Sequence, residues 1–578
     1  MMPTHTSVAE VRRYSHEFRR RQLTLSESVM ANSDTHLIWR GGPKEAPRAA
    51  GCMPGTAPMT SVLFLDPQNS IALARAIPPQ PDHFVDLNLD QAVDAIIGTR
   101  PEYNLIGIFR HPLLTQGEVQ YRHEVFRDLQ EPTLQQALTG FSAQMREMRS
   151  CLTQAEKLYY PHQMKRWHIE AIVIYCEAVL GLGQALHASQ AKSRAVGVRF
   201  QTFLRSYIDT PQFKALHEET HALLAQLDGL AYCIHVNGDT LSVRHYENET
   251  DYSKTIAATF EKFRQGAVKN HSATFHEYPE MNQIEAKVLE FVAKLNPAPF
   301  QLLDDLYART QDFLDATVAE FDREIQFYLA YLEHIQQFET VDRQFCYPEV
   351  SEADKHVYTK DCFDLALGKK LMSEGKTVVC NDFELDDGER MIVVSGPNQG
   401  GKTTFARMFG QQFYLASLGC PVPGTQAKLL LADQIFTHFE RREDINNLRG
   451  KLKDDLERIH HILRSASSRS VLVMNEIFTS TSLADALFLS EKVMQEAIGL
   501  DVLGVWVTFI DELASYGKSV VSMISSVDAV HEKRTFRIIK APAAGRSYAM
   551  SLADKYGLTP ERMMERMNHE SVSDVRGA

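Results

Sequence analysis

One short stretch, residues 391–404, limits what this chain can fold into more than any other part of the sequence. It starts with an apolar, strand-favouring run (391–394) and continues into a glycine-rich segment that ends in a lysine and two threonines. The spacing G-x-x-x-x-G-K-[ST] between a strand and a helix is that of a phosphate-binding loop. Its glycines let backbone N–H groups and the helix N-terminus point at an anion. We therefore predict a nucleotide site formed by Gly396, Pro397, Asn398, Gln399, Gly400, Gly401, Lys402, Thr403 and Thr404.

The second half of such a site is expected at the end of another strand. In this arrangement Lys402 reaches the terminal phosphates and the Thr403 hydroxyl holds Mg²⁺. The apolar run 471–474 ends in Asn475 and Glu476, where an Asp–Glu pair is usual. An amide accepts a hydrogen bond from metal-bound water but brings no negative charge. We therefore expect Asn475 to bind Mg²⁺ weakly, while Glu476 acts as the general base.

Composition sets broad limits on the class of protein. A chain of 578 residues with 44% hydrophobic content can bury more than one core. The net charge of −13 argues against a uniformly basic nucleic-acid coat but not against a local basic surface. The eight cysteines form no C-x-x-C pair, which suits free thiols in a reducing compartment. We find no apolar run near the ~20 residues of a membrane span, and we expect a cytoplasmic protein without a membrane segment.

The pattern along the chain predicts several parts. Residues 1–58, arginine-containing and then rich in glycine, proline and alanine, are expected to be a disordered tail; a basic nucleic-acid arm is the alternative. Residues 59–254 are mainly helical, with a β-hairpin near 230–245 around the turn dipeptide Asn237-Gly238. The apolar pattern of residues 255–345 predicts long helices. Their 3.5-residue apolar period after a break at 296–299 indicates a coiled-coil seam or an arm packed on a neighbouring helix.

Residues 346–578 alternate between strand and helix patterns, which implies a largely parallel sheet flanked by helices. The expected strands are 377–379, 391–394, 471–474, 505–508, 520–524 and 535–539.

Several motifs, in this order, resemble the MutS family of DNA mismatch-repair ATPases. They are 396–404 (GPNQGGKTT), 415–423 (LASLGCPVP), 434–437 (QIFT), 475–482 (NEIFTSTS), 508–513 (TFIDEL) and 545–550 (GRSYAM). The match covers nearly all of residues 385–568. Residues 113–129 and 255–340 resemble that family's core and lever helices more loosely. The resemblance implies a helical core with long levers, followed by an ABC-type P-loop ATPase domain.

The resemblance also implies a dimer with two ATP molecules sandwiched between subunits and a ring around DNA that nucleotide opens or closes. The sandwich needs a signature segment from the opposite subunit. Where the family usually has a Ser-Gly-x-Ser-like sequence, this chain has Arg449, Gly450 and Lys451. These residues either clamp ATP across the dimer or form a solvated helix start.

The chain departs from the family pattern in ways that bear on activity. The switch histidine of the family is Phe509 here, and Asn475 replaces an aspartate, so we expect slow hydrolysis. We expect no N-terminal mismatch-reading domain, which suggests a MutS-related bacterial branch. In the family, that domain carries a Phe-x-Glu wedge. The sequence F-x-E occurs here at 275–277, between the expected hairpin and the long helices, and we regard it as a coincidence.

Two functions follow from this resemblance. The first is a dimeric, ATP-gated DNA clamp that uses ATP and Mg²⁺ and takes part in DNA repair or recombination. From the resemblance we expect a homodimer. It would recognise distorted or branched DNA through its backbone and shape rather than through mismatches. The alternative is a catalytically weak, ATP-binding dimeric scaffold for protein partners.

Overall fold

The structure, a computed structural model, describes residues 60–66, 77–98, 100–237, 240–247, 281–440, 450–527 and 534–543, with 68, 259, 556, 558–560 and 562–564. The predicted tail 1–58, most of residues 255–280 and the motif 545–550 lie outside the described residues. The chain divides into two compact units. One holds Gln136–Ser189 and Gln201–Asp322; the other holds Met59–Gln135, Gln190–Phe200 and Arg323–Ala578.

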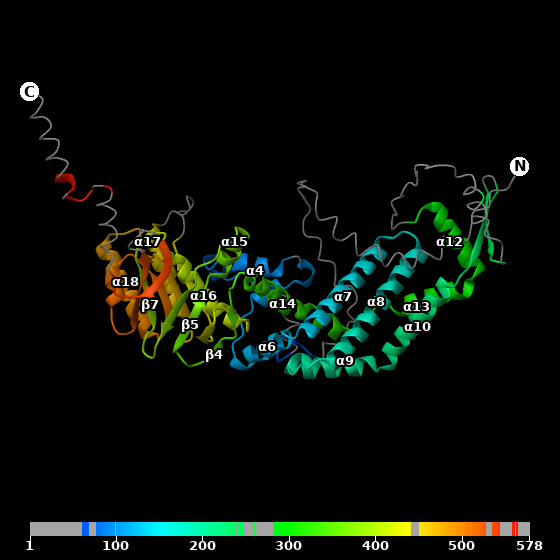
Figure 1. Ribbon diagram of the computed structural model, residues 1–578, viewed down its shortest axis with the longest axis horizontal. Coiled ribbons are helices and arrows are strands. Elements are labelled where there is room, and N and C mark those ends of the chain that lie inside the picture. The colour runs from blue at the N-terminus through cyan, green and yellow to red at the C-terminus, as the bar shows by residue number, and fades with distance from the viewer. Residues whose placement is uncertain are drawn as a thin grey trace, which may run out of the picture. The chain divides into compact units, whose positions relative to one another are not determined.

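The first unit is helical, with one hairpin. Its helices are α7 (Pro132–Lys157, which starts just before the unit), α8 (Pro161–Ala188), α9 (Gln201–Ile208), α10 (Pro211–Asp228), α12 (Gln283–Leu295) and α13 (Pro297–Arg309). Helix α8 packs against α9, α10 and α13 (Figure 1). The predicted hairpin is confirmed as β1 (Tyr232–Asn237) and antiparallel β2 (Thr240–His245). The predicted break is a single residue, Asn296, because proline is tolerated in the first turn of α13.

Helix α8 corrects one expectation from the sequence. Among the described residues it is the one helix long and apolar enough to cross a membrane by length and composition, and 61% of its apolar window is buried within the protein. A largely buried helix at the centre of a helical layer has the same composition. Its His168 and Tyr175 show this packing: His168 Nε2 lies 3.0 Å from the Thr310 carbonyl, and the Tyr175 and Tyr207 hydroxyls are 2.9 Å apart.

Helix α14 (Ala316–Glu339) is buried on several faces, which favours a core helix over a coiled-coil seam. The expected seam residues are buried, but so are residues between them, and Leu314 precedes the helix. A coiled-coil seam would leave those intervening positions exposed. An apolar period of 3.5 describes one face of a helix and cannot show whether the other faces are buried as well. In α14 aromatic and small residues on the other faces are also buried. The buried residues outside the expected seam include Phe327, Leu329, Ala330 and Tyr331.

The second unit contains a six-stranded sheet in the order β10-β11-β12-β7-β13-β14. All neighbouring pairs are parallel except β13 with β14, so the largely parallel sheet is confirmed. The expected strand 377–379 is wrong, because these residues lie in no strand and the next strand, β6, is Asn381–Leu385. Strand β10 was missed as a strand. The bounds are β7 (Met391–Ser395), β10 (Ile435–Phe439), β11 (Val471–Asn475), β12 (Leu503–Val507), β13 (Val520–Val527) and β14 (Arg534–Lys540).

Alternation along these buried strands divides the sheet into two faces. Met391, Val393, Leu472, Met474 and Trp506 share one apolar cluster with residues of α17 (Lys451–Ser465) and α18 (Leu483–Gly499). Helix α16 (Lys402–Ser417) contributes nothing to that cluster and packs against β11 and β12. The sheet is therefore a middle layer between helices (Figure 1).

Smaller elements complete the second unit. They are α3 (His83–Asp86), α4 (Leu89–Ile97), η3 (Pro101–Tyr103), α5 (Ile106–Phe109), α6 (Gln116–Asp128), η4 (Arg194–Phe200), α15 (Leu365–Ser373) and η5 (Asp511–Ser515). A four-stranded sheet has the order β4-β9-β5-β6, and β3 (Phe345–Cys346) pairs with β8 (Val422–Pro423). The strands of the four-stranded sheet are β4 (Glu349–Ser351), β9 (Gln426–Leu430), β5 (Val357–Cys362) and β6 (Asn381–Leu385).

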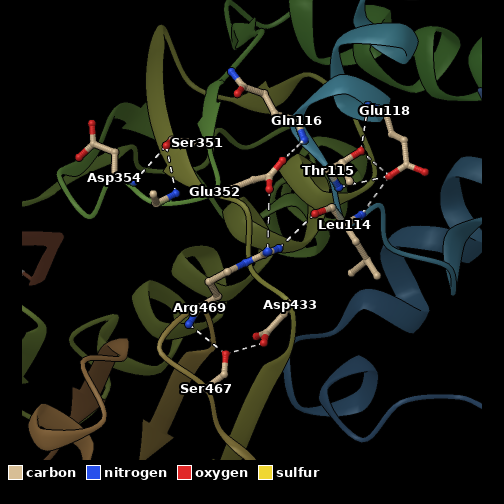
Figure 2. Close-up of polar contacts among 11 residues, drawn as sticks. Leu114, Thr115, Gln116, Glu118, Ser351, Glu352, Asp354, Asp433, Ser467 and Arg469 are labelled. Carbon is tan, nitrogen blue, oxygen red and sulfur yellow. Dashed lines mark hydrogen bonds and ion pairs between the residues drawn. The ribbon is translucent and has the colours of Figure 1, made fainter.

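The second compact unit includes residues 59–135, which the sequence analysis assigned to a separate helical part. These residues belong to it because they contact the C-terminal end of α16. The fully buried Arg122 donates to the Leu418 carbonyl at 2.7 Å, and the Leu113 amide donates to Ser417 O at 2.7 Å. Arg469, just before β11, adds a second link: it donates to the Leu114 carbonyl at 3.1 Å (Figure 2). Helix α6 is thus part of the same unit as the sheet.

Candidate nucleotide site

The glycine-rich loop lies between the central strand β7 and the N-terminus of α16, as the sequence predicted. Gly396 and Gly401 have φ angles of 119° and 93°, and Gln399 has a φ of 60°. Only glycine adopts the first two conformations without strain. A Cβ atom on Gly400 would lie 2.2 Å from the Ser525 hydroxyl oxygen. The loop is therefore closely fitted to the end of β13, and it leaves no room for larger residues.

Lys402 is folded onto its own loop. Its Nζ donates to the carbonyl oxygens of Gly396 at 2.8 Å and Pro397 at 3.1 Å, and to Asn398 Oδ1 at 3.3 Å. The residue is 4% exposed. Burial lowers the pKa of the ammonium group below its ordinary value, and the nearby Glu476 carboxylate opposes that shift. The structure thus brings Lys402 and Glu476, distant in sequence, within electrostatic reach of each other.

The carboxyl ends of the parallel strands bring further polar groups to the loop. Ser395 ends β7 and Asn475 ends β11, and both are buried. Among the described residues, neither Ser395 Oγ nor Asn475 Oδ1 has a hydrogen-bond partner. Buried polar atoms in native proteins nearly always have one. Two such oxygens at the edge where open α/β sheets bind ligands fit a polar ligand or a hydrated cation.

Thr403 and Thr404 lie in the first turn of α16 and are partly exposed. Thr403, Asn475 and Glu476 each carry a side-chain oxygen, and oxygen ligands are those that Mg²⁺ prefers. The residues present therefore fit Mg²⁺.

Glu476 and Phe509 follow the ends of β11 and β12. Glu476 has a φ of 52°, and its N–H donates to the Val507 carbonyl at 2.9 Å. A positive φ is uncommon for glutamate and directs this residue out of the strand. Phe509 is 50% exposed, an unusual position for a large apolar side chain, and it has no polar atom to offer a phosphate.

The expected signature residues are placed only in part. Arg449 lies outside the described residues, and Gly450 is the residue that precedes α17. Lys451 Nζ is 2.5 Å from Glu440 Oε1 and 3.3 Å from Thr479 Oγ1. The Lys451 ammonium lowers the pKa of the Glu440 carboxyl group. Lys451 is therefore bound within its own subunit.

Sequence reasoning missed three residues that shape the loop. Ser525 Oγ donates to the Gly400 carbonyl at 2.7 Å, and Arg534 donates to Gln399 Oε1 at 2.6 Å. Ser395 supplies the buried oxygen described above. The sequence predicted the strand that carries Ser525 but not its register; the parallel pairing of Ile524 with Ser395 places Ser525 beside the loop.

Comparison with known proteins agrees with this geometry. Residues 392–573 match the family model of MutS domain V. The protein named DNA mismatch repair protein MutS of Brevibacillus brevis is 27% identical over 287 residues, which are 48% of this chain and 32% of that protein. The proteins of the same name from Fervidobacterium nodosum and Chlorobium phaeobacteroides are 26% and 27% identical, over 50% and 49% of this chain and 34% and 32% of theirs. The chain thus matches about a third of the length of these relatives. Residues 392–573 are thus similar to MutS domain V, and about half of the chain is similar to proteins of the MutS family.

Proposed function

We propose that this chain is an ATP-dependent DNA-binding protein of MutS type, a dimeric clamp that ATP gates and that hydrolyses ATP slowly. The observation that carries the proposal is the juxtaposition of a glycine-built loop with two buried, unpartnered oxygens at the carboxyl edge of one sheet. The names of the relatives concern DNA mismatch repair. For this chain, we propose a role in DNA repair or recombination in the cytoplasm, with binding to distorted or branched DNA through backbone and shape.

The residues of the loop support ATP binding in a direct way. The Lys402 ammonium now satisfies loop carbonyls. A terminal phosphate would offer it anionic acceptors, and charge-assisted hydrogen bonds are stronger than those to neutral carbonyls. The backbone N–H groups of the loop and the N-terminus of α16 would stabilise the same anion. Binding would therefore turn Lys402 away from its own loop.

Hydrolysis would depend on a weaker set of groups. Glu476 would accept a proton from the attacking water as general base. Bound Mg²⁺ would neutralise developing phosphate charge, with Thr403 and Asn475 as the residues that hold it. The Asn475 amide carries no charge, and Phe509 gives no hydrogen bond to the terminal phosphate. Both features favour slow turnover and a long-lived ATP-bound state.

The first test measures ATP hydrolysis by the purified protein alone, with duplex DNA and with branched DNA. We expect slow turnover that branched DNA stimulates and that Lys402→Ala abolishes. Lys376→Ala is the matched control: Lys376 is exposed and pairs with Glu374 at 2.8 Å, away from the loop, so the change should leave turnover unchanged. Turnover that survives Lys402→Ala would contradict the assignment of the site.

A second candidate function is the weakly catalytic ATP-binding scaffold for protein partners. Lys451, bound to Glu440 in its own subunit, favours it because a signature lysine would first have to leave that ion pair to contact ATP on a second subunit. Glu476→Gln separates the two functions. In an ATPase clamp this variant prolongs the ATP-bound dimer, as gel filtration would show. In the scaffold, dimer lifetime and DNA binding do not respond to ATP or to the substitution.

A further inference from the structure

A second group of chemically active side chains lies in the four-stranded sheet of the second unit. His356 directly precedes β5, Glu384 is in β6 and Asp386 follows that strand. In the antiparallel pairing, Val357 lies opposite Leu385, which places His356 opposite Asp386. Residues two apart on a strand share a face, so both carboxylates stand on the side that the imidazole occupies. One potential ligand atom from each of the three residues lies within 4.8 Å of the other two.

The distances do not correspond to ordinary hydrogen bonding. His356 Nε2 is 3.6 Å from Glu384 Oε1 and 3.6 Å from Asp386 Oδ1. A direct N–H···O bond has its heavy atoms about 2.7–3.2 Å apart. Nε2 is shielded from solvent and has no hydrogen-bond partner among the described residues. The ring nitrogen therefore lies near two carboxylate oxygens without forming an ordinary hydrogen bond to either.

A metal ion accounts for these separations. Zinc bound to imidazole nitrogen and carboxylate oxygen has bonds of about 2.0–2.2 Å, which put tetrahedral ligand atoms about 3.3–3.6 Å apart. The observed nitrogen–oxygen distances of 3.6 Å match the upper end of that range. One imidazole with two carboxylates is a donor set that suits zinc and similar ions; calcium and magnesium prefer oxygen ligands alone.

The turn before His356 fixes the backbone of this residue. The His356 amide donates to Asp354 Oδ1 at 3.0 Å. The Asp354 amide donates to Ser351 Oγ at 3.0 Å (Figure 2). Lys428 of β9 binds the other Asp354 oxygen at 2.7 Å. The histidine is therefore anchored by β4 and β9, and the two carboxylates are carried by β6 and its end.

We propose that His356, Glu384 and Asp386 bind a divalent transition-metal ion of the zinc class, with the fourth position open to water or an external ligand. The Glu384 and Asp386 side chains are 46% and 61% exposed, so an ion can reach their carboxylates from solvent, while the His356 side chain is 34% exposed with its Nε2 covered. The ion joins the start of β5 to the end of the edge strand β6. This site is separate from the residues of the nucleotide site and does not depend on the proposed ATPase.

Titration of the purified, metal-free full chain with ZnCl₂, without nucleotide, tests the proposal. Calorimetry should show a zinc site that excess MgCl₂ does not displace, and zinc should raise the melting temperature. Loss of an outer-shell partner alone costs about 10- to 100-fold in metal affinity. Loss of a ligand should cost at least as much, so we expect His356→Gln and Glu384→Gln each to weaken zinc binding by about 100-fold.

His460→Gln serves as the matched control, because His460 is exposed on α17 and is no part of the cluster. It should leave the affinity and the zinc-induced shift in melting temperature unchanged. Both cluster variants keep a polar side chain of similar length, and their melting temperatures without metal report whether they fold. Zinc affinity that is the same in the original chain, His356→Gln and Glu384→Gln overturns the proposal, as does the absence of zinc binding by the original chain.

Discussion

Replacing Gly400 by alanine tests directly whether the close fit of the loop against Ser525 is needed for nucleotide binding. The new Cβ would lie 2.2 Å from Ser525 Oγ, 3.0 Å from Ser525 Cβ and 3.0 Å from the Pro397 carbonyl oxygen. Something must move, and the Ser525 hydroxyl bond to the Gly400 carbonyl is the first contact to break. Overpacking a well-fitted position costs about 1–3 kcal/mol, and the hydrogen bond contributes about 0.5–1.5 kcal/mol.

The two costs together are about 1.5–4.5 kcal/mol against the observed loop conformation. Because each 1.4 kcal/mol is a tenfold change, nucleotide affinity should fall roughly 10- to 1,600-fold. Fluorescence titration with a labelled ATP analogue measures this. Ser525→Gly removes two of the three close atoms, so the double variant should regain at least about tenfold over Gly400→Ala.

Gly140→Ala is the control. Gly140 lies in α7, and a Cβ there meets nothing within 4 Å. The change should stabilise the helix by about 0.5–1 kcal/mol and leave nucleotide affinity as it was. Two results would refute the reasoning: Gly400→Ala binding as tightly as the original chain, or Ser525→Gly giving no recovery in the double variant.

Three further predictions concern charge and stability. Asn475→Asp should raise Mg²⁺-dependent ATP turnover, and unchanged or lower turnover would contradict the role given to Asn475. Without Mg²⁺ and nucleotide the same change should lower the melting temperature, because it buries an unpaired carboxylate. Burial, aided by Lys369, lowers the pKa of His334 to about 4. Folding therefore favours the neutral ring, and stability present above pH 6.5 is lost as pH falls towards 4, by up to about 3 kcal/mol; a His334→Gln variant with the same pH dependence of its unfolding free energy would contradict this. Thr437→Val removes the 2.7 Å bond to Asp86 Oδ2 and should lower the free energy of unfolding by about 1–3 kcal/mol; a urea midpoint equal to that of Thr437→Ser would count against it.

Local patterns determined much of this protein directly. The glycine spacing and the apolar run before it predicted a loop between a strand and a helix, and that is where β7, the loop and α16 lie. The dipeptide Asn237-Gly238 between alternating runs predicted the β1–β2 hairpin, whose residue Gly238 lies outside the described residues. Strand and helix alternation predicted a mainly parallel sheet. Each of these depends on neighbours in the chain, which a sequence displays.

Other features depended on contacts between distant segments. Only strand register places Ser525 against Gly400, and only burial shows that Asn475 Oδ1 has no partner. The apolar period of α14 is compatible with a coiled-coil seam or with a core helix, and packing on its other faces decided for the core helix. His356 and Asp386 meet because β5 and β6 pair in one register among many. The sequence carries the chemistry of such residues, but their distances are set by the tertiary structure, since pairing register and burial are properties of the whole fold.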